Sequence, residues 1–208
     1  PETARKLVHL LEHAEHLPAL VQRLRSGGRL FLVASGSSYH ACLVGSSFFS
    51  RLAGTLAIPV LPQQLIEQYG GALRKGDVAL YVSQSGETKD VLNAVTYASR
   101  RGVAPLGLVN VLGSTLTRKT EVYLPLACGW EMSVPATKTY TNQVIALLAI
   151  AGALAGQPVH RLTDAPLWIQ RAIDATAATM SELAQRFVTT DRLFLLGFGL
   201  GHGIALEG

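Results

Sequence analysis

Residues 77–88 read DVALYVSQSGET, an apolar run that stops abruptly in a small, polar turn. A continuous apolar run, without the alternation of a half-exposed strand, is typical of a parallel strand covered on both faces. Residues 89–101 then carry a helical pattern of apolar residues. This segment therefore predicts one strand–turn–helix unit of an α/β protein.

The same unit recurs on both sides of this segment. The further predicted elements are strands at 29–34, 106–110 and 122–126, and helices at 39–52, 115–119 and 137–155. Strands that alternate with helices over short connections predict a three-layer, doubly wound parallel sheet. Beyond this rhythm, we expect no internal sequence repeat.

Three stretches divide the chain. Residues 1–28 predict a single N-terminal helix, residues 29–156 the sheet domain, and residues 157–208 the start of a new unit. This last stretch predicts a linker helix at 165–188 and a buried strand at 192–197 with a glycine-rich turn after it. A final strand and turn predict the opening of a second, similar domain, so we expect the sequence to be truncated there.

The composition limits the classes of partner. The chain is 49% hydrophobic and 15% charged, so it can bury a large core. Its net charge of +4 comes from scattered basic residues, which suits small anionic substrates and argues against nucleic acid. No apolar run is long enough to span a bilayer, so we expect no membrane association. Cys42 and Cys128 form no CxxC pair and predict buried free thiols in a reducing cytoplasm.

The turn at 83–88 concentrates hydrogen-bonding groups where parallel sheets bind ligands, beyond the carboxyl ends of the strands. It brings three hydroxyls and one amide to a helix start: Ser83, Gln84, Ser85 and Thr88. Backbone N–H groups and the helix dipole suit a phosphate there without any lysine. Helix capping by Ser85 alone is the competing interpretation. We expect Glu87 to face away from a bound anion.

Other signals are weaker. SGSS at 35–38 offers similar donors, but serine and glycine also occur in ordinary turns, so it gains weight only beside the first turn. HLLEH at 9–13 matches a zinc protease spelling, yet we expect this helix outside the sheet, without a cleft for a third ligand. The glycines at 197–203 do not form a dinucleotide motif. The sequence therefore predicts neither a metal nor a cofactor.

Three segments carry a resemblance. SGSSY at 35–39, SQSGET at 83–88 and SVPATKTYT at 133–141 resemble the signature segments of the sugar isomerase (SIS) domain family. LGFG at 196–199 and IALEG at 204–208 resemble the opening of that family's second SIS domain. The resemblance is closest to the members that aminate fructose 6-phosphate or deaminate glucosamine 6-phosphate, and it spans nearly the whole chain.

The resemblance implies roles for individual residues. It assigns the sugar phosphate to Ser83, Gln84, Ser85 and Thr88, and sugar or phosphate contacts to Ser37, Ser38 and Val134. Glu207 is a further candidate, and Lys138 either points at the substrate or reaches solvent. The chain departs from the family at Pro135 and Ala136, which removes a backbone donor and a serine hydroxyl. The family's general base is expected beyond Gly208, so the catalytic residue is unknown.

Two functions follow from the resemblance. The first is a homodimeric enzyme that binds a hexose 6-phosphate or hexosamine 6-phosphate and performs aldose–ketose isomerisation with amination or deamination. Such a reaction needs a carboxylate that carries a proton between adjacent carbons. The alternative is a non-catalytic phosphosugar sensor of a regulator. A regulator should carry a DNA-binding helix-turn-helix before the sheet, and the single helix predicted there favours the enzyme.

Overall fold

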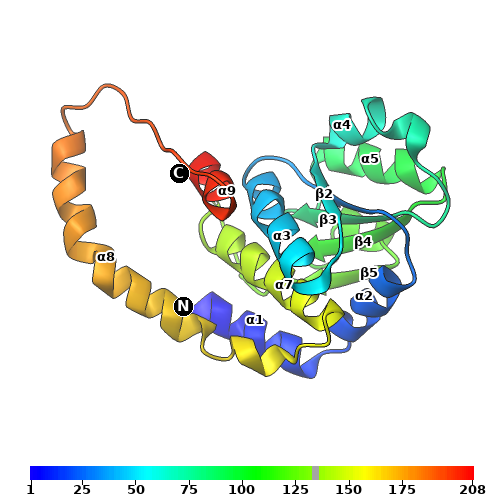
Figure 1. Cartoon of the computed structure of the whole chain (residues 1–208), viewed down its shortest axis with the longest axis horizontal. Helices are drawn as coiled ribbons and strands as arrows, with labels where there is room; N and C mark the ends of the chain where they lie inside the picture. The colour runs from blue at the N-terminus through cyan, green and yellow to red at the C-terminus, as the bar shows by residue number, and fades with distance from the viewer. Residues whose placement is uncertain (133–135) are drawn as a thin grey trace.

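The computed structural model describes residues 1–132 and 136–208. Its centre is a five-stranded parallel sheet of order β2-β1-β3-β4-β5 (Figure 1). The strands are β1 Leu30–Val33, β2 Ala57–Val60, β3 Val78–Ser83, β4 Ala104–Val109 and β5 Val122–Pro125. All four pairings are parallel. The doubly wound α/β fold expected from the sequence is confirmed.

Helices cover both faces of the sheet. One face carries α1 Glu2–His13, α2 His16–Arg25, α3 Ser37–Ala53 and α7 Lys138–Leu154, and the other α4 Pro62–Glu67, α5 Lys89–Ser99 and α6 Thr115–Lys119. Short 3-10 helices follow α4, at Gly70–Ala72, and α7, at Val159–Leu162. Side chains of β1 alternate between the two cores: Leu30 and Leu32 pack on one face, and Phe31 and Val33 on the other.

The N-terminal segment forms two helices, α1 and α2, so the expectation of one helix is wrong. The chain is extended at Ala14, with φ −99° and ψ 145°. Pro18 explains the break because its nitrogen has no hydrogen to donate to the carbonyl of Ala14, four residues earlier. Both helices bury apolar residues such as Leu7 and Leu20 in the core.

The sequence analysis also missed an edge strand and the helix after it. β2 is short and contains Pro59, which cannot donate a ladder hydrogen bond. At the edge of the sheet it pairs with β1 alone, so the proline costs little there. The helix α4 follows directly.

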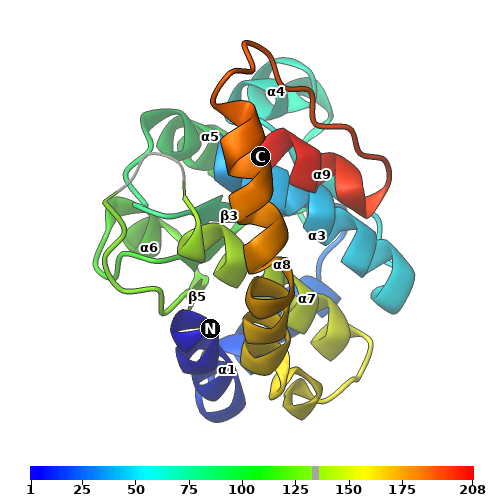
Figure 2. The ribbon, with the colours of Figure 1, turned by 90° about the vertical axis from the view of Figure 1, so that its left-hand side faces the viewer.

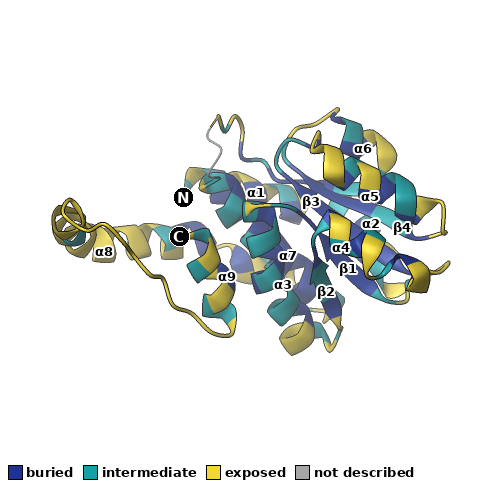
Figure 3. Ribbon diagram, turned by 90° about the horizontal axis from the view of Figure 1, so that it is seen from above, coloured by how far each residue is buried: buried dark blue, intermediate teal, exposed yellow. Residues whose placement is uncertain are grey.

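The C-terminal segment differs from its prediction. The helix α8, Ala165–Phe187, forms as expected, extends away from the sheet and is largely exposed (Figure 3). The expected buried strand at 192–197 is wrong: this backbone has no sheet neighbour among the described residues, and Phe194 and Leu196 are 80% and 93% exposed. A helix that was not expected, α9 Leu200–Glu207, lies against α3 (Figure 2).

The segments that contain the starts of α3 and α9 have similar sequences, so the expectation of no internal repeat is wrong. RLFLVASGSSYHACLVG at 29–45 aligns without a gap with RLFLLGFGLGHGIALEG at 192–208. The helices α3 and α9 begin at equivalent positions, after Gly36 and Gly199, whose φ angles are 58° and 57°. One glycine-capped helix start, preceded by a similar apolar segment, is therefore present twice in the chain.

The contacts between α3 and α9 follow the same equivalence. His40 corresponds to Gly203 in the alignment, and Val44 corresponds to Glu207. His40 bonds Glu207, while Gly203 lies so close to Val44 that an added Cβ would be 2.8 Å from its Cγ2. Exchanging the two copies maps one contact onto the other, which is the pattern of a pseudo-twofold helix pair.

Candidate functional site

The two small-residue turns lie on adjacent strands. β1 and β3 pair in register, with Val33 opposite Tyr81, and both run in the same direction. The turn at 34–36 leaves β1 and leads to α3, while the turn at 83–88 leaves β3 and leads to α5. Both therefore open at the carboxyl edge of the sheet, where α/β proteins bind ligands.

The turn at 83–88 is held by its own hydroxyls. Ser83 Oγ accepts a hydrogen bond of 3.0 Å from the backbone N–H of Gly86, and Ser85 Oγ accepts one of 3.1 Å from that of Glu87. Gly86 has φ 67°, and a Cβ there would overlap the hydroxyl of Ser114. This position therefore requires glycine for both conformation and space.

The side chains of this turn differ in access. Ser83 is buried, so its hydroxyl supports the turn from beneath, whereas Gln84 and Ser85 are half-buried and Thr88 is exposed. Thr88 is the N-cap residue of α5, whose first N–H groups have no partner within the helix. Serine oxygens that accept backbone bonds still have their own hydrogens to donate. The exposed side of the turn is thus rich in donors.

Glu87 is held by the neighbouring helix. Its carboxylate accepts a 2.7 Å hydrogen bond from the backbone N–H of Thr115, at the start of α6. This bond lowers the pKa of the Glu87 carboxyl below its usual value. The Glu87 carboxylate therefore points toward the start of α6, as expected for a side chain that faces away from a bound anion.

The turn at 34–36 is supported by a residue that the sequence analysis missed. Ser38 is buried in the first turn of α3, and its Oγ accepts a 2.8 Å hydrogen bond from Nε2 of Gln143. Gln143 is 1% exposed on α7, directly before the apolar stretch 144–154 of that helix. A glutamine next to the apolar stretch of this helix was the signal in the sequence that could have identified it. Ser37, beside Ser38, is half-buried.

The third signature segment is only partly described. Val134 lies outside the described residues. Glu131, before the undescribed residues 133–135, accepts 3.1 Å hydrogen bonds from the backbone N–H groups of Thr137, Lys138 and Thr139 after them, and so caps α7. Burial opposes ionisation, but these hydrogen bonds keep the pKa of Glu131 below its usual value. Lys138 Nζ donates to the carbonyl of Trp130.

Glu207 meets α3 close to the Ser38 turn. Its Oε2 lies 2.8 Å from Nδ1 of His40, two residues beyond Ser38, and both side chains are less than a quarter exposed. Burial, and secondarily the charge of Glu207, raise the pKa of Tyr140.

A cavity of about 400 Å³ adjoins the turn at 83–88. Its lining includes Gln84, Asn110, Trp130 and Glu131. A larger cavity of about 880 Å³ lies between α1, α2 and the end of α7, and none of the turn residues line it. We place the candidate site at the turn at 83–88, where the smaller cavity adjoins it through Gln84.

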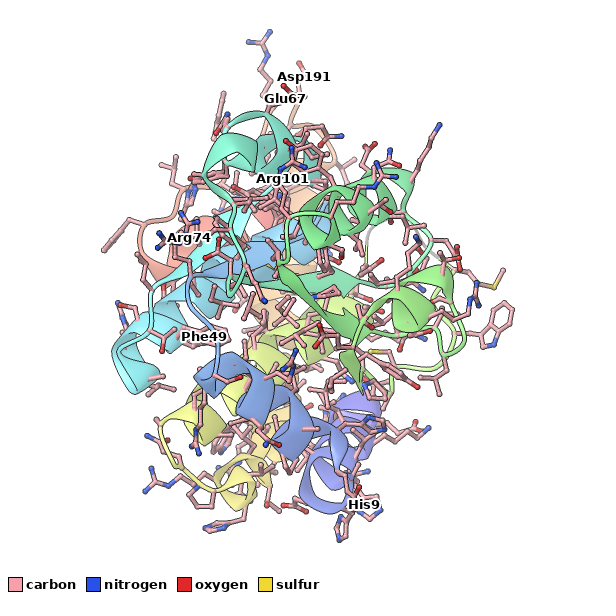
Figure 4. All side chains as sticks on the ribbon, turned by 90° about the vertical axis from the view of Figure 1, so that its right-hand side faces the viewer. His9, Phe49, Glu67, Arg74, Arg101 and Asp191 are labelled. Carbon is pink, nitrogen blue, oxygen red and sulfur yellow. The ribbon has the colours of Figure 1, made fainter. Side chains whose placement is uncertain are left out.

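The weaker sequence signals gain no support. His9, from the zinc-like spelling, points outward from α1 (Figure 4), and the described residues contain no cluster of metal-ligating side chains. Within the same residues, no helix is both long and apolar enough to cross a bilayer.

Comparisons with known proteins agree on one family. Residues 23–153 match the SIS domain model. The glutamine–fructose-6-phosphate aminotransferase of Aeropyrum pernix is 37% identical over 99% of this chain and 36% of its own length. That of Pyrobaculum aerophilum is 34% identical over 100% of the chain and 35% of its own length. The chain thus spans about a third of the curated relatives that it matches.

Solved structures show the same fold. The C-terminal domain of glucosamine-fructose-6-phosphate aminotransferase from Francisella tularensis superposes with a TM-score of 0.83 at 21% identity, covering 100% of this chain and 62% of that one. Glucosamine-6-phosphate deaminase from Thermotoga maritima superposes with a TM-score of 0.67 at 19% identity, covering 99% of this chain and 64% of that one.

Proposed function

This chain belongs to the SIS domain family, and from that premise we propose that its 83–88 turn binds the phosphate of a hexose 6-phosphate or hexosamine 6-phosphate. We propose further that the protein interconverts fructose 6-phosphate and glucosamine 6-phosphate, by isomerisation coupled to amination or deamination. The aminotransferase relatives support the substrate class. Because the chain spans about a third of them, the complete reaction belongs to the proposal.

One observation carries the proposal: two donor-rich turns leave adjacent parallel strands at one edge of the sheet. Gln84, Ser85 and Thr88 are the accessible members of the first turn, and Ser83 shapes it from beneath. A phosphate placed over the start of α5 would accept from these side chains and from free backbone N–H groups. Ser37 and Ser38, in the first turn of α3 directly after the turn at 34–36, would reach the same ligand.

The enzyme is favoured over the sensor by the N-terminal helices. A second helix precedes the sheet, as a helix-turn-helix would require, but α1 and α2 bury their apolar faces against the sheet domain. Helices committed to the core in this way are a poor DNA-binding unit. Glu207, bonded to His40 two residues beyond Ser38, is a candidate carboxylate for contact with the sugar.

We also propose that residues 192–208 open a second SIS unit and that the protein is a cytoplasmic homodimer. The repeat between 29–45 and 192–208 supports the second unit. Leu196 and Phe198 are more than nine-tenths exposed, and apolar surface of this kind needs further protein to cover it. Analytical ultracentrifugation tests the dimer, which a monomer at micromolar concentration would contradict.

The phosphate assignment is tested by titration calorimetry with glucosamine 6-phosphate, fructose 6-phosphate and inorganic phosphate. We expect all three to bind, and Ser85→Ala combined with Thr88→Ala to weaken them about 10-fold or more, since two donors to an anion are lost. Ser46→Ala removes a hydroxyl that bonds within α3 and is the matched control. Binding that survives the double substitution unchanged would move the site elsewhere.

A further inference from the structure

Gln143 is a buried amide directly beneath the Ser38 turn. It lies on α7, is 1% exposed, and donates from Nε2 to Ser38 Oγ over 2.8 Å. Burying an amide in an apolar core costs free energy unless it is hydrogen-bonded. Only one side of this amide is paired, because Gln143 Oε1 has no partner among the described residues. A hydrophobic residue would fill the position at lower cost, so the amide calls for a function.

The bond fixes the role of the Ser38 hydroxyl. A serine hydroxyl has one hydrogen to donate and two lone pairs to accept. Since one lone pair receives the hydrogen of Gln143, the hydroxyl's own hydrogen stays available to a ligand. In the reverse orientation Oε1 would lie against Ser38 Oγ, so the hydroxyl hydrogen would go to Gln143 and not to a ligand.

The turn itself does not need this hydroxyl. In the repeat, Ser37 and Ser38 correspond to Leu200 and Gly201, which carry no hydroxyl. The second copy still forms a glycine-capped helix start with the same geometry, since φ is 57° at Gly199 and 58° at Gly36. The Ser38–Gln143 pair is therefore an addition to a backbone that folds without it.

We propose that Gln143 is a positioning residue that makes Ser38 a hydrogen-bond donor to an acceptor oxygen of the sugar phosphate. The inference rests on the proposed function and specifies the ligand atom: a phosphoryl, carbonyl or ring oxygen, and not the hydrogen of a sugar hydroxyl. Ser85 has the same polarity, because its Oγ accepts from Glu87. The two turns then present donors to one ligand from adjacent strands.

A double-mutant cycle on the full chain tests this. Gln143→Met, Ser38→Ala and the double variant are titrated with glucosamine 6-phosphate and with inorganic phosphate. We expect each single substitution to weaken binding about 3- to 10-fold and the double variant to be no weaker than Ser38→Ala, because both remove one donor. Losses with both probes place the acceptor on the phosphate, and a loss with the hexosamine alone places it on the sugar. An equal loss from Gln143→Met in both backgrounds overturns the proposal, because Gln143 then acts without Ser38.

Asn142→Leu is the matched structural control. Asn142 is the neighbouring buried amide of α7 and bonds the carbonyls of Leu126 and Thr3. Its replacement should lower the melting temperature and leave the affinity unchanged. If Gln143→Met does not fold, Gln143→Asn replaces it, and if neither folds, Ser38→Ala decides: unchanged affinity overturns the inference. A wild-type chain that binds neither probe instead refutes the proposed function, and the inference with it.

Discussion

His40 Nδ1 lies 2.8 Å from Glu207 Oε2, and this bond joins α3 to α9 across 167 positions of sequence. The pseudo-twofold relation between the two helices pairs this bond with a second contact, the close packing of Gly203 against Val44. A polar pair on one side and a small residue on the other bring the two helices close together. The carboxylate of Glu207 is thereby held against His40, which lies two residues beyond Ser38.

The close approach of α9 predicts a sharp difference between two glycines. A Cβ at Gly203 would lie 2.8 Å from Val44 Cγ2 and 2.9 Å from the carbonyl oxygen of His40, whereas one at Gly201 meets nothing within 4 Å. Gly203→Ala should weaken the docking of α9 by about 1–3 kcal/mol through overpacking. Gly201→Ala should strengthen the helix by up to about 1 kcal/mol.

Hydrogen exchange of the α9 amides measures both changes. We expect faster exchange in Gly203→Ala and slower exchange in Gly201→Ala, with the α7 amides unchanged in each. Similar exchange in the two variants would show that helix propensity, and not contact with α3, determines the stability of α9.

A second pair of glycines tests the proposal that the turn at 83–88 binds phosphate. Gly86 and Gly54 have φ angles of 67° and 60°, so alanine at either position costs about 1–2 kcal/mol. Only at Gly86 would the new Cβ also overlap the Ser114 hydroxyl. Gly86→Ala should therefore abolish phosphate binding, while Gly54→Ala, at the end of α3, should lower stability alone. Calorimetric titration with inorganic phosphate separates them, and equal affinities would contradict the assigned turn.

The cap on α7 predicts a pH dependence. Folding lowers the pKa of Glu131, so its ionised carboxylate stabilises the fold at neutral pH, and this stabilisation disappears as the pH falls through the lowered pKa. Glu131→Gln should cost about 1 kcal/mol at pH 7 and much less near pH 3. Thermal melts across this range measure the difference. Glu67→Gln, at an exposed carboxylate of α4 (Figure 4), should show none, and a pH-independent loss at Glu131 would exclude the charge as its cause.

The sequence predicted what depends on local pattern. Continuous apolar runs identified β1 and β3, and the small residues after them located both turns, because buried parallel strands and their turns have local signatures. The break between α1 and α2 at Ala14 also has a local cause, but the effect of Pro18 was overlooked in the sequence. β2 is too short, and too interrupted by Pro59, to give a pattern.

Contacts set by packing could not be predicted in this way. The bond from Gln143 to Ser38 spans 105 positions and depends on how α7 rotates against α3. The run at 192–197 shows the converse limit. Its apolar pattern is typical of a buried strand, and the prediction is wrong because a strand forms only beside a neighbour that shares its hydrogen bonds, which the described residues do not provide.

The last prediction concerns the amino end of β3, opposite the turn at 83–88. Asp77 is 2% exposed and receives two hydrogen bonds from Arg29, of 3.0 and 2.6 Å, and a third from the backbone N–H of Arg74. Burial opposes ionisation, but Arg29 and the Arg74 N–H keep the pKa of Asp77 below its usual value. Asp77→Asn should therefore leave Arg29 without its anionic partner and lower the free energy of unfolding.

We expect Asp77→Asn to lower the free energy of unfolding by about 2–3 kcal/mol. This is less than for a fully buried ion pair, because the Arg29 side chain is 34% exposed. Glu2→Gln, which breaks the exposed Glu2–Lys6 pair, should change stability by less than about 0.5 kcal/mol. Urea denaturation measures both. Phosphate affinity of the folded fraction should survive Asp77→Asn, because Asp77 precedes β3 while the turn follows it. Equal stabilities for the two variants would show that the buried pair adds nothing, and lost affinity would show that the amino end of β3 controls the site at its carboxyl end.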